Sequence, residues 1–338
     1  MKKTINILLA IVFAISLAFN MGCNGCKAKT PDKITVIAPD GAPAISIAQM
    51  MANNENFGEE VTYTIVNSTN LSTYITEGVD VAVVPVNMAT MVAAKGYKIV
   101  AINTQGNLYM LGANVISNLT DLIGKKVGCI QYGNVPGLTL RAILNEANVP
   151  YQQIGDVNSD IDENKVNIFG CEPTAVAGLL SANKADYVLT AEPSAIVVIN
   201  KLTSAGKDVK VCLNIQQIYE TTFGEKYPQA VTIVSDKLIE KNPAFIKKFV
   251  KGLQNNASYL TEDNITSIIE AINTHMEEGV TSSLSSANLN IVSLINSNVE
   301  YADAQANKDR IINYINKIIT IDATKAKAIS EDIFYSVK

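Results

Sequence analysis

Several residue types that build common active sites are scarce in this 338-residue chain. It contains no tryptophan, one histidine, His275, and two arginines, Arg141 and Arg310. His275 stands in the helical tail beside Glu277 and Glu278, where we expect a surface residue. This excludes a Ser-His-Asp triad near a ligand cleft, and a single histidine excludes a metal site that needs several. With only two arginines, few residues could bind a ligand carboxylate or sulfonate through the paired hydrogen bonds of a guanidinium. A neutral or weakly anionic ligand, held by helix N-termini, Asn, Ser, Thr and Tyr, fits this inventory better.

Cysteine is equally sparse in the body of the chain. After residue 32 only Cys129, Cys171 and Cys212 remain, and their long, irregular spacing matches no metal-binding pattern. Cys129 and Cys212 stand in β-like runs, which predicts small buried hydrophobic side chains. The sequence leaves open whether two of these three cysteines form a disulfide. We expect no metal and no cofactor.

The charge balance is acidic. The chain has 27 basic and 32 acidic side chains, a formal charge of −5. This balance argues against a nucleic-acid partner, because neutralising phosphates requires clustered Lys and Arg. The length exceeds what one typical core fills, which predicts two lobes.

The N-terminus has the pattern of an export signal. Lys2 and Lys3 precede an apolar run over residues 5–19, and a small residue stands before Cys23. This predicts a secretory leader over residues 1–22, too short to be interpreted first as a membrane-spanning helix.

The cysteine at the expected cleavage point indicates an acylated thiol. The leader resembles those of bacterial lipoproteins, although Asn20 stands where an aliphatic residue is usual. We predict lipidation at Cys23, a lipidated tether over residues 23–32, and an extracytoplasmic protein anchored to the cell membrane by this lipid. Cys26 is a second candidate for acylation, and secretion without an anchor is the alternative.

The body opens on a strand, a turn and a helix. Residues 34–38 are β-rich, residues 39–42 have turn chemistry, and Pro43 begins an apolar stretch with helical spacing up to Met51. Free N–H groups at a helix start attract a carboxylate, a sulfonate or a polarised carbonyl. We therefore interpret this loop as one wall of a ligand cleft; the alternative is an ordinary strand–helix connection.

The same pattern recurs along the chain. Further strands are predicted at residues 60–66, 79–85 and 97–102, separated by polar loops and helices. A second copy of the opening design follows, with a strand at 127–131 and a loop at 132–137 that begins a helix. Such repetition is typical of open, mainly parallel sheets flanked by helices, in which ligands bind at the carboxyl ends of the strands. Apolar stripes after residue 242 predict packing helices, while residues 281–298 have no clear assignment.

The order of these segments resembles the substrate-binding proteins of bacterial ABC importers, most closely the group for nitrate, alkyl sulfonates, taurine and thiamine-precursor pyrimidines. The matching pieces extend from Lys33 to about Lys251. They are KITVIAPDGAPA, VDVAVVPVNMA, DLIGKKVG, YGNVPGLTLRAIL, ADYVLTAEPSA and YPQAVTIVSDKLIEKNPAFIKKF, after a lipoprotein-like leader.

The resemblance implies a bilobal, type II periplasmic-binding-protein-like α/β fold. Residues 33–112 and 229–338 would form lobe 1 and residues 113–228 lobe 2, joined by two hinge strands near 108–112 and 229–234. Such a protein closes on a small organic molecule and delivers it to a membrane permease with an ATPase subunit, as a monomer.

The resemblance also implies a set of ligand contacts at the strand ends. Several have structural alternatives: Glu192 would cap a helix, Ser68 to Asn70 would end a strand, and Tyr132 would cover the core instead of stacking on a ring. The set is Asp40, Gly41, Ala42, Ser68, Thr69, Asn70, Asn87, Met88, Tyr132, Gly133, Asn134, Val135, Glu172 and Glu192.

Two other function classes compete with transport. Enzymes with this bilobal fold act on chorismate-derived compounds in menaquinone synthesis, but they are expected in the cytoplasm, so the leader disfavours them. An anchored sensor or adhesion module would lack the cleft, and no Ser/Thr-rich stalk is present. We predict a binding protein and no catalysis.

Overall fold

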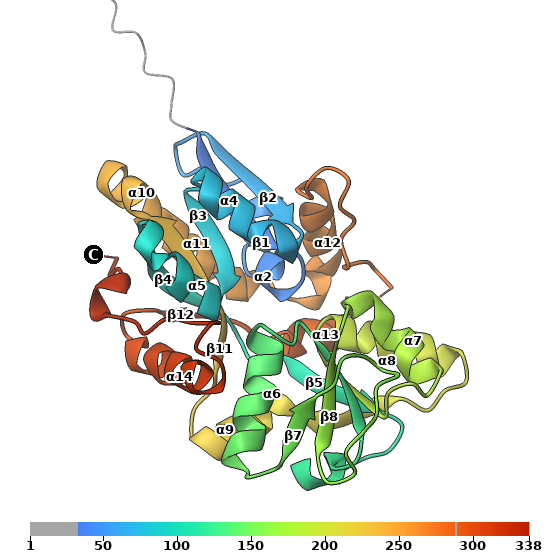
Figure 1. The fold of residues 1–338 in the computed structure, drawn as a ribbon. Helices are drawn as coiled ribbons and strands as arrows, with labels where there is room; N and C mark the ends of the chain where they lie inside the picture. Colours follow the sequence, from blue (N-terminus) through green and yellow to red (C-terminus); the bar gives the residue numbers. More distant parts are fainter. Residues whose placement is uncertain (1–32, 288, 338) are drawn as a thin grey trace, which may run out of the picture. The chain divides into compact units, whose positions relative to one another are not determined.

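The computed structural model describes residues 33–287 and 289–337. The predicted leader, the tether and the acylation at Cys23 lie outside the described residues. Residues 34–338 form one compact unit, which contains two six-stranded sheets with helices packed against them (Figure 1).

The first sheet has the strand order β12-β4-β11-β3-β1-β2. β1 pairs in parallel with β2 and β3, whereas β11 is antiparallel to β3 and β4, and β12 is antiparallel to β4. The sheet is therefore mixed, because the chain returns to it late through β11. Its strands are β1 (Ile34–Pro39), β2 (Val61–Val66), β3 (Val81–Pro85), β4 (Tyr97–Gln105), β11 (Pro228–Ser235) and β12 (Val299–Asp303).

The second sheet has the order β10-β5-β9-β6-β8-β7. β6 is parallel to β8 and β9, and β7 is parallel to β8, while β5 is antiparallel to both β9 and β10. Its strands are β5 (Leu108–Gly112), β6 (Lys126–Ile130), β7 (Tyr151–Gln153), β8 (Val166–Cys171), β9 (Tyr187–Ala191) and β10 (Lys210–Asn214).

The helices follow the strands in sequence. Those attached to the first sheet are α2 (Ala42–Ile45), α3 (Ala48–Ala52), α4 (Leu71–Glu77), α5 (Val86–Val92), α10 (Asp236–Lys241), α11 (Pro243–Tyr259) and α12 (Ile265–Thr274). Those of the second sheet are α6 (Val135–Glu146), α7 (Val176–Ser181), α8 (Ser194–Ser204) and α9 (Ile215–Phe223).

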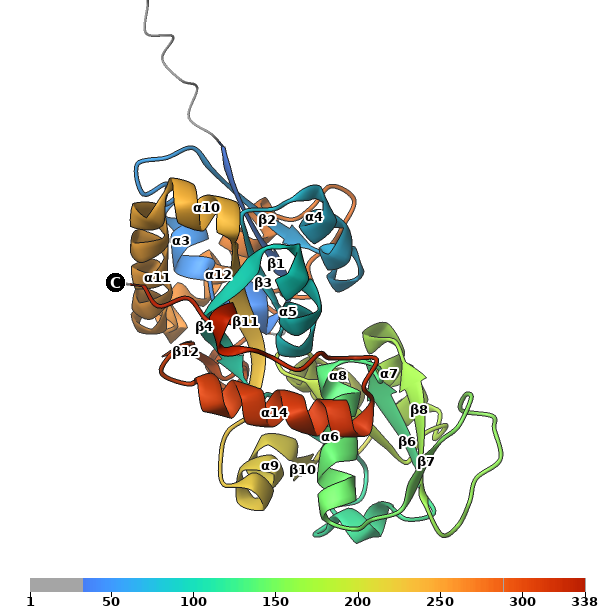
Figure 2. The same ribbon diagram turned by 60° about the vertical axis from the view of Figure 1, so that its left-hand side comes forward.

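The last two helices come from the C-terminal part of the chain. α13 (Ile291–Asn296) lies in the segment without a predicted assignment, and it begins with reciprocal hydrogen bonds between Asn290 and Ser293. α14 (Lys308–Ile321) packs on α6 of the second sheet and on α5 and β11 of the first (Figure 2). Its buried Tyr314 hydroxyl lies 2.6 Å from the Thr139 hydroxyl on α6. The core is continuous between the two sheets at this helix.

One sequence expectation about the first sheet needs correction. The helix predicted over residues 43–51 is two short helices, α2 and α3, separated at Ser46 and Ile47. Residues 108–112 form β5 and pair within the second sheet, and their role as a hinge strand between the lobes stays a prediction. The apolar pattern of this strand predicts burial but carries no information on which sheet it joins. The remaining lobe limits stay predictions.

In the described part of the chain no helix is long and apolar enough to cross a membrane. Cys129, Cys171 and Cys212 are free thiols, so none of the possible disulfides among them is formed. Cys129 and Cys212 are buried, as their β-like runs predict, and burial raises the pKa of the Cys212 thiol to about 11.

Candidate functional site

The predicted contacts of lobe 1 come from neighbouring strand ends of the first sheet. Pro39 at the end of β1 pairs with Val66 at the end of β2, so Asp40 to Ala42 lie beside Ser68 to Asn70. β3 flanks β1 on its other side and leads directly into α5, which carries Asn87 and Met88. The fold therefore aligns three predicted loops along one sheet edge.

A segment not predicted to contribute covers part of this edge. The Asp40 carboxylate accepts hydrogen bonds from the Ser282 hydroxyl at 2.9 Å and from the Ser283 backbone N–H at 2.6 Å. Glu277 accepts from the Asn70 amide at 2.9 Å and from the Tyr74 hydroxyl at 3.0 Å. Asp40 and Asn70 thus already have protein partners.

The other residues of this edge differ in exposure. Ser68 and Thr69 are exposed, in a short 3-10 turn that the Asn67 side chain caps by accepting from the Thr69 N–H. Gly41 has the left-handed φ of 95° and lies before Ala42, which is buried as the first residue of α2. The positive φ of Gly41 agrees with the turn chemistry of residues 39–42.

Asn87 is the most constrained of the predicted contacts. It is 4 % exposed, its amide nitrogen donates to the Lys325 carbonyl at 3.0 Å, and its side-chain oxygen is buried without a hydrogen-bond partner. The Lys327 N–H donates to the Thr90 hydroxyl on the same helix. The segment after α14 therefore lies against α5. Met88 is half-buried and packs against the core.

The second predicted wall lies where β6 leads into α6. α6 begins at Val135, so the predicted loop ends there and not at 137. The Arg141 guanidinium carbon lies 4.5 Å from the centre of the Tyr132 ring, and this guanidinium donates to the Tyr132 and Gly137 carbonyls. Tyr132 thus stacks on an arginine of its own chain. Asn134 precedes the helix, and its side chain forms no capping hydrogen bond.

Lys325 connects the two predicted walls. Its backbone carbonyl accepts a hydrogen bond from the Asn87 side chain. Its ammonium nitrogen lies close to Gly133, 3.4 Å from the position that a Cβ atom on this glycine would occupy. The pKa of Asp322 is lowered chiefly by hydrogen bonds from Thr324, and also by the positive charges of Lys325 and Arg141. Sequence reasoning missed Lys325, because nothing in residues 320–330 indicates that this segment returns to the strand ends.

The last two predicted contacts are the glutamates after β8 and β9. Glu172 is exposed and makes no capping hydrogen bond with its side chain. Glu192 is 4 % exposed, and its carboxylate accepts from the Ile196 N–H at 3.1 Å in the first turn of α8. Burial raises the pKa of Glu192, while hydrogen bonds from Ile196 and Asn296 oppose the rise. Glu192 thus accepts a hydrogen bond from the first turn of α8, as its capping alternative predicts, and its contact with a ligand stays a prediction.

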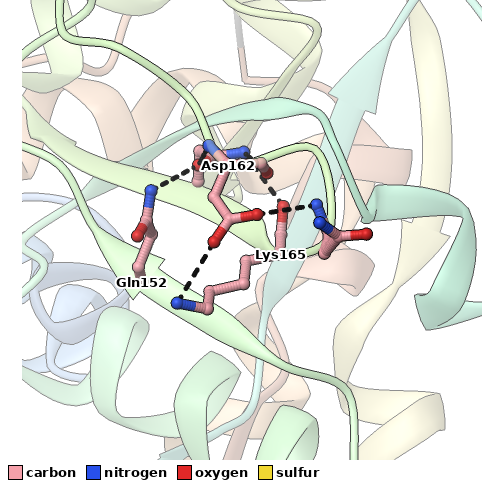
Figure 3. Close-up of polar contacts among 5 residues, drawn as sticks. Gln152, Asp162 and Lys165 are labelled. Carbon is pink, nitrogen blue, oxygen red and sulfur yellow. Dashed lines mark hydrogen bonds and ion pairs between the residues drawn. The ribbon is translucent and has the colours of Figure 1, made fainter.

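Other polar clusters serve the structure. Asn167, fully buried on β8, accepts from Gln152 and from the Asp162 N–H and donates to three carbonyls; Asp162 also pairs with Lys165 at 3.2 Å (Figure 3). These bonds hold the loop before β8. His275 is half-buried against Tyr63, and is not the surface residue expected. Within residues 33–287 and 289–337 no group of three or more His, Cys, Asp or Glu is arranged to hold a metal ion.

Two cavities lie away from the predicted loops. One of about 660 Å³ lies between α3, α11 and β12, and one of about 500 Å³ lies between the ends of α6 and α9. Neither is lined by a predicted ligand contact. The cleft itself therefore stays a prediction.

Comparison with known proteins identifies relatives of this fold. An ABC transporter protein from Parabacteroides distasonis is 15 % identical with a TM-score of 0.69, over 90 % of this chain and 99 % of its own. The periplasmic aliphatic sulphonate binding protein SsuA from Escherichia coli is 13 % identical with a TM-score of 0.65, over 91 % and 93 %. The alkanesulfonate-binding protein SsuA from Xanthomonas axonopodis pv. citri, bound to MOPS, is 12 % identical with a TM-score of 0.58, over 90 % and 99 %. None of the curated proteins compared matches the chain.

These likenesses confirm the predicted fold class, a bilobal α/β architecture of the periplasmic-binding-protein kind. Residues 66–264, more than half of the sequence, match the model of the family described as NMT1/THI5 like. The chain therefore belongs to the NMT1/THI5-like family.

Proposed function

We propose that this protein is the solute-binding component of an ABC importer, which captures a small organic molecule between its two sheets and delivers it to a membrane permease. The observation that carries the proposal is the family match over residues 66–264. The names of structural relatives, an ABC transporter protein and two sulfonate-binding proteins, support the same role.

The proposed ligand lies between the loops at the carboxyl ends of the strands. The buried, unpaired Asn87 oxygen would accept a hydrogen bond from the ligand, and Ser68, Thr69 and Asn134 offer further polar groups. The Lys325 ammonium beside Gly133 provides a positive charge at the start of α6, where the helix dipole also favours an anion. We therefore propose that an anionic group of the ligand lies on the α6 side, in keeping with the neutral or weakly anionic ligand expected from the composition.

The proposal includes the partners and the location predicted from the sequence. The protein would work outside the cytoplasm as a monomer, held to the membrane by a lipid on Cys23, next to a permease and its ATPase. Mass spectrometry of the chain extracted from membranes tests the anchor. Two or three acyl groups at the mature N-terminal cysteine are expected, and an unmodified N-terminus would contradict it.

A thermal-shift screen tests the binding function. The chain from Lys27 onward is suitable, because residues 34–338 form one compact unit. A panel of nitrate, taurine, alkanesulfonates and aminopyrimidines should contain a compound that stabilises the protein by RT ln(1 + [L]/Kd), about 2.7 kcal/mol at a hundredfold excess over Kd.

The same samples distinguish binding from catalysis. Each stabilising compound is recovered by mass spectrometry after prolonged incubation, and it should be unchanged. Conversion of the compound, with a rate proportional to protein concentration, would replace the transport proposal with an enzyme on the same fold. A panel without any stabilising compound would count against both.

A further inference from the structure

The cavity between α3, α11 and β12 has the size of a small-molecule site. Its volume is about 660 Å³, within the range of roughly 300 to 1,000 Å³ of ligand pockets. Figure 2 shows α3 and α11 side by side and β12 close to the lower end of α11. The cavity shares no lining residue with the loops of the proposed transport site.

Apolar side chains form the inner part of this cavity. Met50 is 1 % exposed and Val250 4 % exposed, and both belong to the core cluster of the first sheet. Phe57 lines the cavity beside them, held edge-on by the rings of Phe245 and Phe249 at 5.6 and 6.2 Å. A hydrocarbon chain placed against these groups would be removed from water, which favours binding.

Lysines line the outer part. Lys247, Lys248 and Lys251 are exposed on α11, and Lys248 donates to the Phe57 carbonyl at 2.7 Å. The side-chain ammonium groups of Lys247 and Lys251 have no hydrogen bond or ion pair within the described residues.

Two carboxylates also line the cavity, Glu55 and Asp303. Asp303 accepts a hydrogen bond from the Ala306 N–H at 2.7 Å and is thereby directed to its own turn. The lining has three positive and two negative side chains, in a chain whose formal charge is −5. The local balance therefore favours an anion, contrary to the balance of the whole protein.

We propose that this cavity is a second binding site, for a dissolved amphipathic organic anion. The hydrocarbon part lies against Met50, Phe57 and Val250, and the carboxylate, sulfonate or phosphate head pairs with Lys247 and Lys251. The site is independent of the transport ligand, because the two sets of lining residues do not overlap.

Isothermal titration calorimetry with decanoate, below its micelle concentration, tests the proposal on the chain from Lys27 onward. The key variant is Lys247→Gln/Lys251→Gln, whose exposed positions leave the core intact. Two exposed ion pairs together contribute about 1 kcal/mol, so Kd should rise about fivefold. The matched control, Lys201→Gln/Lys207→Gln, removes the same charge from exposed positions on α8 and in the loop before β10, and it should leave Kd unchanged.

Three further arms make the test decisive. Asn255→Trp, which places a large ring at an exposed lining position, should abolish binding, whereas Tyr132→Ala in the proposed transport site should not alter it. Decan-1-ol lacks the charge and should bind the wild type more weakly than decanoate does. Its Kd should be the same for Lys247→Gln/Lys251→Gln as for Lys201→Gln/Lys207→Gln.

Several results would overturn the second site. These are no binding of decanoate by the wild type, an unchanged Kd in Lys247→Gln/Lys251→Gln, or loss of binding in Tyr132→Ala. Sedimentation of the protein with phosphatidylglycerol vesicles, combined with no binding of dissolved decanoate, would assign the lysines to a lipid surface and also contradict the proposal. Failure here leaves the transport proposal standing, since that rests on other residues.

Discussion

The two strand–loop–helix units, one in each sheet, differ more in structure than in sequence. After β1 the helix α2 has only four residues, whereas after β6 the helix α6 has twelve. The Ser46 hydroxyl donates to the Pro43 carbonyl at 2.6 Å, and Ile47 leaves the helical conformation with a φ of −120°. A serine hydroxyl that bonds to a nearby carbonyl competes with helical hydrogen bonding, which explains why α2 stops there.

The two units also differ in the charged groups beside them, and so in how each would hold a ligand. The first unit has a short helix, and its one carboxylate, Asp40, is bound by Ser282 and Ser283. The second unit has a full helix, whose start lies beside the Lys325 ammonium. In the proposed function the first unit supplies shape and neutral polar contacts, and the second supplies positive charge. Similar loop sequences therefore predict that a loop leads into a helix, but they predict neither the length of that helix nor the charge beside it.

Gly137→Ala should disrupt the second unit and should lower the free energy of unfolding more than the other substitutions. A Cβ at this position would lie 2.6 Å from the Tyr132 carbonyl carbon and closer still to its oxygen, and backbone atoms cannot rotate away. We expect the free energy of unfolding to fall by about 3 kcal/mol or more. Urea unfolding followed by circular dichroism measures it. A loss below about 1 kcal/mol would show that this turn tolerates a side chain.

Gly41→Ala is the matching change in the first unit, with a smaller expected effect. A Cβ here would have no atom within 4 Å, so the cost comes only from the φ of 95° that L-residues rarely adopt. We expect a loss of about 1 to 2 kcal/mol in the same unfolding assay. A loss equal to that of Gly137→Ala would contradict the distinction between conformational strain and overlap.

Asp40→Asn tests whether the first carboxylate has a structural role. The amide keeps one acceptor and places an N–H₂ group against a donor, so about 1 kcal/mol of stability should be lost. A double-mutant cycle with Ser282→Ala should give a coupling energy above zero, measured by urea unfolding. Full additivity of the two single changes would show that the contact contributes nothing.

Glu192→Gln should have the smallest effect, visible as a change in pH dependence. Burial raises the folded-state pKa of Glu192 above its ordinary 4.5, so the folded chain binds this proton more tightly than the unfolded chain. The free energy of unfolding should therefore fall as pH rises from 4.5 through the folded-state pKa. Gln cannot ionise and still accepts from the Ile196 N–H, so the variant should lack this fall. Parallel pH profiles of the two proteins would contradict the assignment.

Much of the fold was predictable because it is encoded locally. Asn242 and Pro243 predict the start of α11, and the structure shows the Asn242 side chain accepting from the Phe245 N–H. Phe245, Phe249 and Leu253, four residues apart, are all buried as their helical spacing predicts. Strand ends that face a common edge follow from the β-loop-α-β order.

The parts that could not be predicted depend on contacts distant in sequence. Asn87 and Lys325 are hydrogen-bonded across 238 positions, and Asp40 and Ser282 across 242. No periodicity or turn motif in the sequence indicates which distant element the chain will contact after a helix ends. The two loops could therefore be identified from their own residues. Ser282, which binds the Asp40 carboxylate, and Lys325, which adds a positive charge beside Gly133, could not.

The most direct test of the central claim, that one ligand is held jointly by both units, is calorimetric titration of the compound found in the thermal-shift screen. Asn87→Ala, on α5 after the first sheet's β3, and Lys325→Gln, beside α6, should each weaken binding by about tenfold, since each removes a hydrogen bond or charge interaction of about 1 to 2 kcal/mol. Lys201→Gln, an exposed change away from both, should leave the affinity unchanged. Unaltered affinity in both Asn87→Ala and Lys325→Gln would show that the ligand binds elsewhere and would contradict the account.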